Sequence, residues 1–473
     1  MKKINIIWFL VFGLWFLVAG CSSDDDNQST MMTIDAIYLE DASSGTSVHD
    51  RLISVPEIGF VRLGQTIRIQ GSGFTGLKKI LINGYDTYFN NALLTDNNVW
   101  VSLNTKTPVG SEAGESQNTI VLVKDKSTAS YAFTVRAASP SITSISCTMP
   151  MPGEVVMVSG ANLHETSKVT LPGGVVVTDI ENDPEGEGEW FSFVMPEGVT
   201  EAGYIESEGV NGKAQSPSYF NDFRCFIINY DEDGHGVLGS WSATYSADDL
   251  VDDPLGSGRG KCVMIIPQSV LDEGGVAAGK TSLPGFYTAG NDEATDDWTR
   301  MTEFIPGETS INNLALQFDV CVPEEWDLTG QVQFTLQNNL STYGYGAADA
   351  QYSNQYIHQA YVWVPWLDDS DFSHTAFTTG TQWQTVTIPL NKFGNYTSEA
   401  DYPGDWGRPY TFSSVITDRN SGSYRNLGVL FSNADIKNGE DVAYPGLETS
   451  QKIYIDNLRI VNTTANSVSD FDD

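Results

Sequence analysis

Short stretches of alternating apolar and polar residues run along most of the chain, and they predict β-strands. In a strand every second side chain lies on the same face, so alternation marks a half-buried strand. No stretch has the spacing of a convincing amphipathic helix. The clearest strands in the second half are predicted over 314–321, 331–336, 361–364, 383–388, 426–431 and 452–460. The pattern therefore predicts an all-β protein.

A repeated glycine frame divides the first half of the chain into two similar units. Three glycines of the first unit recur in the second at one constant offset of 89, with an apolar strand between the first two. These pairs are Gly64 and Gly153, Gly71 and Gly160, and Gly84 and Gly173. A constant offset over three positions is an internal repeat. We expect two small antiparallel immunoglobulin-like sandwiches, over 33–137 and 138–221.

From about residue 222 the glycine frame is lost and a longer β segment follows. About 240 residues of strands and long loops fit one large sandwich or jelly roll. We predict this domain over 222–463, followed by a disordered tail over 464–473.

The N-terminus has the pattern of an export signal. Lys2 and Lys3 precede an apolar run of 16 residues, shorter than the roughly 20 that a membrane-spanning helix needs. The run ends in Val-Ala-Gly-Cys21, which resembles a bacterial lipobox, so we expect a signal peptide over 1–20 and a lipid on Cys21. A secretory signal with a chance cysteine, or a membrane anchor, is the alternative. The acidic residues 24–26 lie in an expected tether over 21–32 and resemble a Bacteroidota surface-export signal.

The charge of the chain narrows the classes of partner. Twenty-five basic residues against 61 acidic ones give a net charge of −36. Such a chain lacks the basic surface that meets nucleic-acid phosphates or anionic lipid headgroups. We therefore expect no nucleic-acid partner and favour a neutral one.

Four cysteines follow Cys21, and none are spaced as a CxxC motif. They are Cys147, Cys225, Cys262 and Cys321. The sequence leaves open whether they are buried thiols or form one or two disulfides.

Aromatic residues gather in the third domain and point to sugar recognition. Seven tryptophans follow residue 222, namely Trp241, Trp298, Trp326, Trp363, Trp366, Trp383 and Trp406. A pyranose stacks its C–H face on an aromatic ring, while its hydroxyls bond to polar side chains. In the segment 361–364, alternation puts Tyr361 and Trp363 on one face and two valines on the other. Valines suit a core, so we predict outward-facing rings; the alternative is that the rings are core.

Other residues of the third domain are also candidates for sugar binding. Trp366 follows Pro365 and could extend a stacking platform. Gln333 is predicted to share an outward face with Gln331 and Thr335, opposite the apolar residues of the same strand. Trp298 and Trp406 fit either binding loops or loop packing, whereas Trp326 and Trp383 are expected to be structural.

Catalytic and metal signatures are weak. The sequence contains no HExxH, GxSxG or P-loop motif, and its adjacent carboxylates are best explained as solvated charge. We expect no cofactor. Asp231 and Asp233 hint at a structural calcium loop, which Asp456 could join.

These observations resemble features of known protein families. The glycine repeat resembles IPT/TIG immunoglobulin-like modules, and the segments 383–390 and 453–460 resemble strands of carbohydrate-binding jelly rolls. With Cys21 and the acidic tether, the layout resembles the surface glycan-binding proteins of Bacteroidota polysaccharide-utilisation loci. This resemblance implies a non-catalytic, lipid-anchored outer-membrane protein exposed at the cell surface.

The resemblance also implies a ligand and partners. The ligand would be a neutral plant polysaccharide such as xyloglucan, mixed-linkage glucan or mannan, bound by the C-terminal domain. It would be passed to a partner transporter and surface glycanases. An adhesin that works through its Ig-like repeats and an endo-glycanase are the alternatives.

Overall fold

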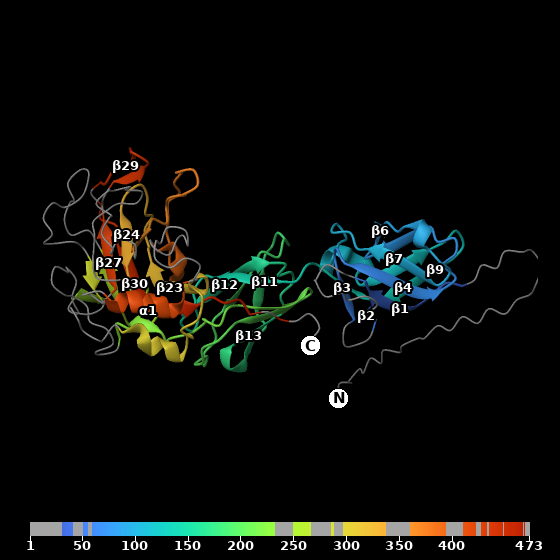
Figure 1. Cartoon of the computed structure of the whole chain (residues 1–473), viewed down its shortest axis with the longest axis horizontal. Helices are drawn as coiled ribbons and strands as arrows, with labels where there is room; N and C mark the ends of the chain where they lie inside the picture. Colours follow the sequence, from blue (N-terminus) through green and yellow to red (C-terminus); the bar gives the residue numbers. More distant parts are fainter. Residues whose placement is uncertain are drawn as a thin grey trace, which may run out of the picture.

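The computed structural model consists of three β-rich units, which follow one another in a row (Figure 1). The structure describes residues 31–40, 51–54, 59–231, 249–265, 285–287, 297–336, 360–393, 410–421, 427–432, 435–447, 449–466 and 468. Cys21 and the acidic residues after it lie outside these ranges. Strands dominate the described residues, so the all-β prediction is confirmed. None of the helices described is both long enough and apolar enough to span a bilayer.

The first unit is a sandwich of two four-stranded sheets, β2-β1-β4-β7 and β6-β5-β8-β9, with a parallel pair β3-β10. Their apolar faces enclose one core. Its elements are β1 (Thr33–Leu39), β2 (Arg51–Leu52), β3 (Phe60–Arg62), β4 (Thr66–Ser72), β5 (Lys79–Ile82), β6 (Tyr85–Thr87), η1 (Asn91–Leu93), β7 (Asn98–Ser102), η2 (Gly110–Ser116), β8 (Thr119–Val123), β9 (Thr128–Ala132) and β10 (Thr134–Arg136).

The second unit repeats this design with sheets β11-β12-β16-β15 and β14-β13-β17-β18. Its elements are β11 (Ser141–Ile145), β12 (Val155–Ala161), β13 (Lys168–Leu171), η3 (Pro172–Gly174), β14 (Val175–Val177), β15 (Ile180–Asn182), β16 (Trp190–Val194), β17 (Glu206–Gly209) and β18 (Gly212–Gln215).

The repeated glycines have the same structural task in both units. A Cβ atom on Gly71 would lie 1.9 Å from the backbone oxygen of Thr33, and one on Gly160 would lie 1.9 Å from that of Ser141. Both glycines allow the first strand of the unit, β1 or β11, to lie close to its antiparallel neighbour, β4 or β12. The constant offset in the sequence therefore marks one structural constraint that occurs twice.

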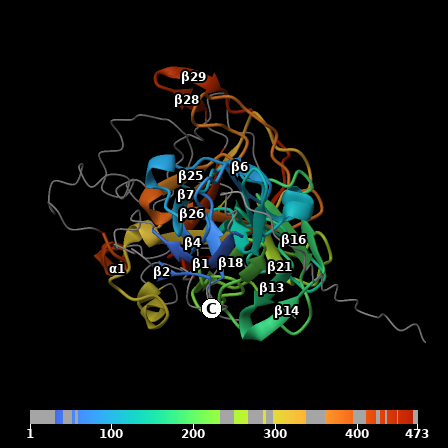
Figure 2. The ribbon, with the colours of Figure 1, turned by 90° about the vertical axis from the view of Figure 1, so that its right-hand side faces the viewer.

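The third unit packs a six-stranded sheet against a four-stranded one. The larger sheet has the order β20-β21-β30-β23-β26, with β19 also paired to β30; the smaller has the order β22-β27-β24-β25 and is called the β24 sheet below. The rings of Phe318 and Phe334, one from each sheet, lie 4.7 Å apart in the core between them. A small hairpin, β28-β29, projects from one edge of this unit (Figures 1 and 2).

The strands of the third unit come from segments that are distant in sequence. They are β19 (Phe226–Ile228), β20 (Leu250–Asp252), β21 (Lys261–Ile265), β22 (Gly285–Tyr287), β23 (Leu314–Cys321), β24 (Gln331–Thr335), β25 (Ala360–Trp363), β26 (Gln384–Pro389), β27 (Gly428–Ser432), β28 (Ile436–Asn438), β29 (Asp441–Tyr444) and β30 (Ile453–Asn462). The helical elements are η6 (Trp298–Glu303), η7 (Ile311–Asn313), η10 (Leu390–Lys392) and α1 (Phe412–Ser421).

Buried polar contacts join the units. Between the first two, the Arg62 guanidinium donates to the carbonyl oxygens of Ala137 and Asn211, each at 3.0 Å. Between the second and third, the backbone N–H of Thr148 donates to the Thr385 hydroxyl at 2.8 Å. Ala315 and Val461 of the third unit also belong to the core of the second. The second and third units therefore share a continuous interface.

The four described cysteines are free and buried. Burial raises the pKa of the Cys147 and Cys321 thiols to about 11 and that of Cys225 to about 12. These thiols are protonated at neutral pH and unreactive, so they serve as small apolar side chains.

Candidate functional site

The β24 sheet contains most of the residues that the sequence singles out. Strand β24 pairs with β25, with Gln333 opposite Val362, and on its other side with β27. Val332 and Phe334 point into the core. Alternation then places Gln331, Gln333 and Thr335, the glutamine row, on the other face. The predicted division of this strand into an apolar and a polar face agrees with the structure, but the predicted outward exposure of the polar face is wrong, because all three of its residues are buried.

The glutamine row is nevertheless buried, because the β24 sheet is covered on both faces. Gln333 is 3% exposed, and its side-chain carbonyl oxygen Oε1 has no hydrogen-bond partner among the residues that the structure describes. A buried acceptor left unpaired costs about 1–3 kcal/mol, so such atoms commonly meet a ligand or a water. A sugar hydroxyl is a donor of the required kind.

The predicted outward orientation of Tyr361 and Trp363 is wrong, and the alternative holds. Trp363 is 7% exposed, and its ring makes edge contacts with Phe318, Trp326 and Phe377 at centroid distances of 5.3, 5.6 and 5.7 Å. Tyr361 shares this inner face and is half-buried against Phe393. Burial raises the pKa of its hydroxyl, and the charge of Asp369 adds to the rise. A valine does not identify the core side of a sheet that is buried on both faces.

Two other predicted binding tryptophans are also core residues. Trp366 is fully buried, and its indole N–H donates to the Gly330 carbonyl at 3.3 Å. Trp298 is fully buried under the guanidinium of Arg419, 3.8 Å above its ring. Neither ring has a free face for a sugar in this conformation. Trp406 lies outside the described residues, so its role stays a prediction.

The expected structural role of Trp326 and Trp383 agrees with their surroundings. Both are buried, as a sandwich core requires. The Trp326 N–H donates to the Thr329 carbonyl at 2.7 Å, and the Trp383 N–H donates to the Asp253 carboxylate at 2.9 Å. Each buried indole N–H therefore has its partner.

A buried charge cluster that the sequence does not reveal connects β23, β30 and the second unit. Asp319 accepts from Arg259 and Arg459, each at 3.0 Å. Burial works to raise the pKa of Asp319, but the two arginines outweigh it and hold this pKa below its usual value. Arg459 also donates to the Thr148 hydroxyl of the second unit at 2.6 Å. The Nε atoms of Arg259 and Arg459 are buried without a partner among the described residues. We interpret this cluster as structural because its ion pairs and the Thr148 contact join two strands of the third unit to the second unit.

The three aspartates predicted as calcium ligands, Asp231, Asp233 and Asp456, differ in their surroundings. Asp456 lies in the charge cluster, where burial and then the charge of Asp319 raise its pKa to about 8. Asp231 accepts from the backbone N–H of Lys261 at 2.7 Å, and Asp233 lies outside the described residues. Within the described ranges, no group of three or more His, Cys, Asp or Glu is arranged to hold a metal ion.

Comparison with known proteins places the third unit in a family. The sequence profile described as the surface glycan-binding protein B xyloglucan binding domain matches residues 220–462. An IPT/TIG domain-containing protein of Bacteroides ovatus is 29% identical over 192 residues. That alignment covers 41% of this chain and 36% of the relative, so the chain spans about a third of the curated protein it matches.

A solved structure shares the architecture. The surface glycan-binding protein PbSGBP-B of Prevotella bryantii aligns with a TM-score of 0.63 at 19% identity, covering 92% of this chain and all of that one. At that identity the likeness shows the fold. An SGBP-B of Bacteroides uniformis covers 91% of this chain and 99% of its own at 17% identity, with a TM-score of 0.42.

The fold and these matches define the class: a carbohydrate-binding surface protein with IPT/TIG Ig-like units and a C-terminal β-sandwich. Within that class, the chain belongs to the surface glycan-binding protein B family, through its xyloglucan binding domain over residues 220–462.

Proposed function

We propose that the protein captures a neutral β-linked plant polysaccharide, xyloglucan foremost, through its C-terminal domain. The observation that carries the proposal is the match of residues 220–462 to a xyloglucan binding domain. The chemistry of the β24 sheet supports it, because the glutamine row offers neutral hydrogen-bonding groups. The net charge of −36 disfavours anionic glycans such as pectins.

We further propose a division of labour around the β24 sheet. The glutamine row is the polar base of the site, with Gln333 as a hydrogen-bond acceptor. Tyr361, the most accessible of the predicted rings described, and Trp406 stay candidates for contact with the sugar. Trp298, Trp363 and Trp366 support the site by holding the sheet in place.

The setting of this activity is also part of the proposal. We place the protein at the outer membrane, exposed at the cell surface and anchored by a lipid on Cys21. In this proposal it binds glycan and catalyses no reaction. The captured glycan would pass to a transporter and to surface glycanases. Surface location is the expectation for the family, and the lipobox sequence supports the anchor.

Affinity gel electrophoresis of residues 22–473 tests the proposal. The gels contain xyloglucan, mixed-linkage β-glucan, galactomannan, xylan or pectin. We expect retardation by xyloglucan or another neutral β-linked glycan, none by pectin, and no release of reducing sugar. Unchanged mobility in every gel would refute glycan capture and favour an adhesin, while release of reducing sugar would indicate an enzyme.

A further inference from the structure

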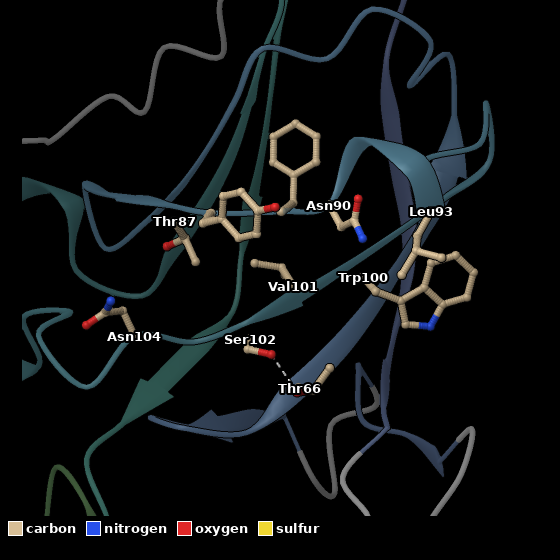
Figure 3. Close-up of a pocket in the computed structure, with 10 residues that line it drawn as sticks. Thr66, Thr87, Asn90, Leu93, Trp100, Val101, Ser102 and Asn104 are labelled. Carbon is tan, nitrogen blue, oxygen red and sulfur yellow. Dashed lines mark hydrogen bonds between the residues drawn. The ribbon is translucent and has the colours of Figure 1, made fainter.

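The first Ig-like unit has a cavity of about 450 Å³ at the edge of β7. This volume falls within the roughly 300–1,000 Å³ typical of small-molecule sites. Its lining combines aromatic and aliphatic side chains with amides and hydroxyls, from Thr66, Thr87, Tyr88, Phe89, Asn90, Leu93, Trp100, Val101, Ser102 and Asn104. Figure 3 shows Asn90, Leu93 and Trp100 together at one end and Thr87 and Asn104 at the other, with Val101, Ser102 and Thr66 between them.

Two of the three aromatic residues of this cavity, Tyr88 and Trp100, are accessible, in contrast to the tryptophans described in the third unit. Tyr88 is 83% exposed, although it follows a fully buried Thr87 on the end of β6. Trp100 is half-exposed on β7. An exposed tyrosine and a tryptophan on one cavity offer apolar faces to a ligand without requiring the fold to open.

Two polar side chains of the cavity, Asn90 and Asn104, are held in a fixed orientation by hydrogen bonds within the protein. The side-chain oxygen of Asn90 accepts from the Ala92 N–H at 2.9 Å, and that of Asn104 accepts from the Lys106 N–H at 2.8 Å. Each bond fixes its amide, and the amide NH₂ groups are donors suited to hydroxyl oxygens. No lining residue is Asp, Glu, Lys, Arg or His, in a chain with 86 such acidic and basic residues besides histidine. The lining therefore matches an uncharged ligand with many hydroxyls.

The second unit shows that the cavity is not a necessary feature of the repeat. There, β15 pairs with β16 over three residues and covers the edge that corresponds to β7. In the first unit this contact is reduced to one bridge, between Phe89 and Val101, and the chain then turns into η1. The glycine offset aligns Thr66 with Val155, which is 42% exposed, so the second unit is aliphatic at this position.

We propose that this cavity is a second saccharide-binding site, in which a segment of a neutral β-linked glucan stacks on Tyr88 and Trp100 and bonds to Asn90 at one end and to Asn104 at the other. The site is separate from the C-terminal one and does not depend on it. Together, two sites on one chain would hold a polymer at two points.

Binding stoichiometry on residues 22–473 tests this inference, by native mass spectrometry with cellohexaose and a xyloglucan-derived heptasaccharide. The wild type is expected to bind two equivalents and Tyr88→Ala one. Tyr88→Phe keeps the ring and should bind two, as should the matched control Tyr204→Ala, which removes an exposed tyrosine of the second unit.

Each outcome separates this inference from the C-terminal proposal. One equivalent in the wild type and in Tyr88→Ala overturns the second site and leaves the C-terminal site standing. One equivalent in the wild type and none in Tyr88→Ala supports the cavity and overturns the C-terminal site. No binding by the wild type overturns both.

Discussion

At the scale of single residues, the β24 sheet is defined by one unsatisfied atom and one buried ring. Within the described residues, Gln333 Oε1 is a buried acceptor without a donor. Trp363, on the opposite face of the sheet, is held by three aromatic neighbours. The first residue is suited to meet a ligand and the second to keep the sheet in shape.

Replacing Gln333 with leucine tests whether this side chain contacts the glycan rather than stabilising the fold. Gln333→Leu keeps the size of the side chain and removes the unpaired carbonyl, so the thermal midpoint is expected to stay or rise. Affinity for xyloglucan should fall about tenfold, equivalent to about 1.4 kcal/mol, through loss of one hydrogen bond. Isothermal titration calorimetry and a thermal melt measure both. Wild-type affinity in this variant would remove Gln333 from the site.

Truncating Trp363 should act on the fold. Trp363→Ala opens a cavity among Phe318, Trp326 and Phe377, at a cost of about 3–5 kcal/mol. We expect a lower midpoint in denaturant, with glycan binding lost in step with the folded fraction. A variant of unchanged stability that has lost binding would instead restore Trp363 as a stacking residue.

At the scale of elements, alternation predicts most strands because the physics that produces it is local. It finds both faces of β24, and the glycine frame finds the close crossing in each Ig-like unit. It fails on β25 because burial of the second face depends on segments distant in sequence. It also misses α1, where the apolar stripe is limited to Phe412, Val415 and Ile416 and the remaining residues are mostly polar.

The charge cluster on β23 and β30 cannot be predicted from the sequence either, because its burial also depends on segments that are distant along the chain. Asp319 and Arg459 look like ordinary surface charges of two alternating strands. Only the cross-strand register and the docking of the second unit bury them together. The same holds for the cavity of the first unit, where residues from β4, from the segment around η1 and from β7 line one space.

The cluster predicts a pH dependence with a definite sign. The pKa of Asp456 is about 8 in the folded protein, against 3.8 ordinarily. Its contribution to stability is therefore complete below pH 3.8 and is lost as the pH rises through 8. Asp456→Asn avoids this loss, so its advantage in thermal midpoint over the wild type should grow from pH 5 to pH 9.

A second variant of the same cluster, Asp319→Asn, should have the opposite effect on stability. Asp319 has a lowered pKa, so its contribution is present at neutral pH and is lost on acidification. Asp319→Asn leaves Arg259 and Arg459 without their shared counter-charge and should be strongly destabilising at pH 7, by about 3–5 kcal/mol. Equal midpoints for both variants across this pH range would contradict the assignment.

At the scale of the whole molecule, the interface between the second and third units makes them one structural body. Ala315, Val461 and the Thr148–Thr385 contact lie on that interface. A fragment cut at residue 222 exposes this surface, whereas one beginning at 138 keeps it. We expect calorimetry to give fragment 222–473 a lower midpoint than 138–473, by about 2–4 °C for each 1 kcal/mol lost. Equal midpoints would show that the units are independent.

The central claim is that the C-terminal domain binds a neutral β-linked glycan. Affinity electrophoresis of fragment 138–473 in xyloglucan, beside residues 22–473, tests it most directly. We expect the fragment to be retarded, less strongly than residues 22–473 because it lacks the first unit. A folded fragment that migrates as it does without glycan, while the full chain is retarded, would contradict the claim and place binding in the Ig-like region.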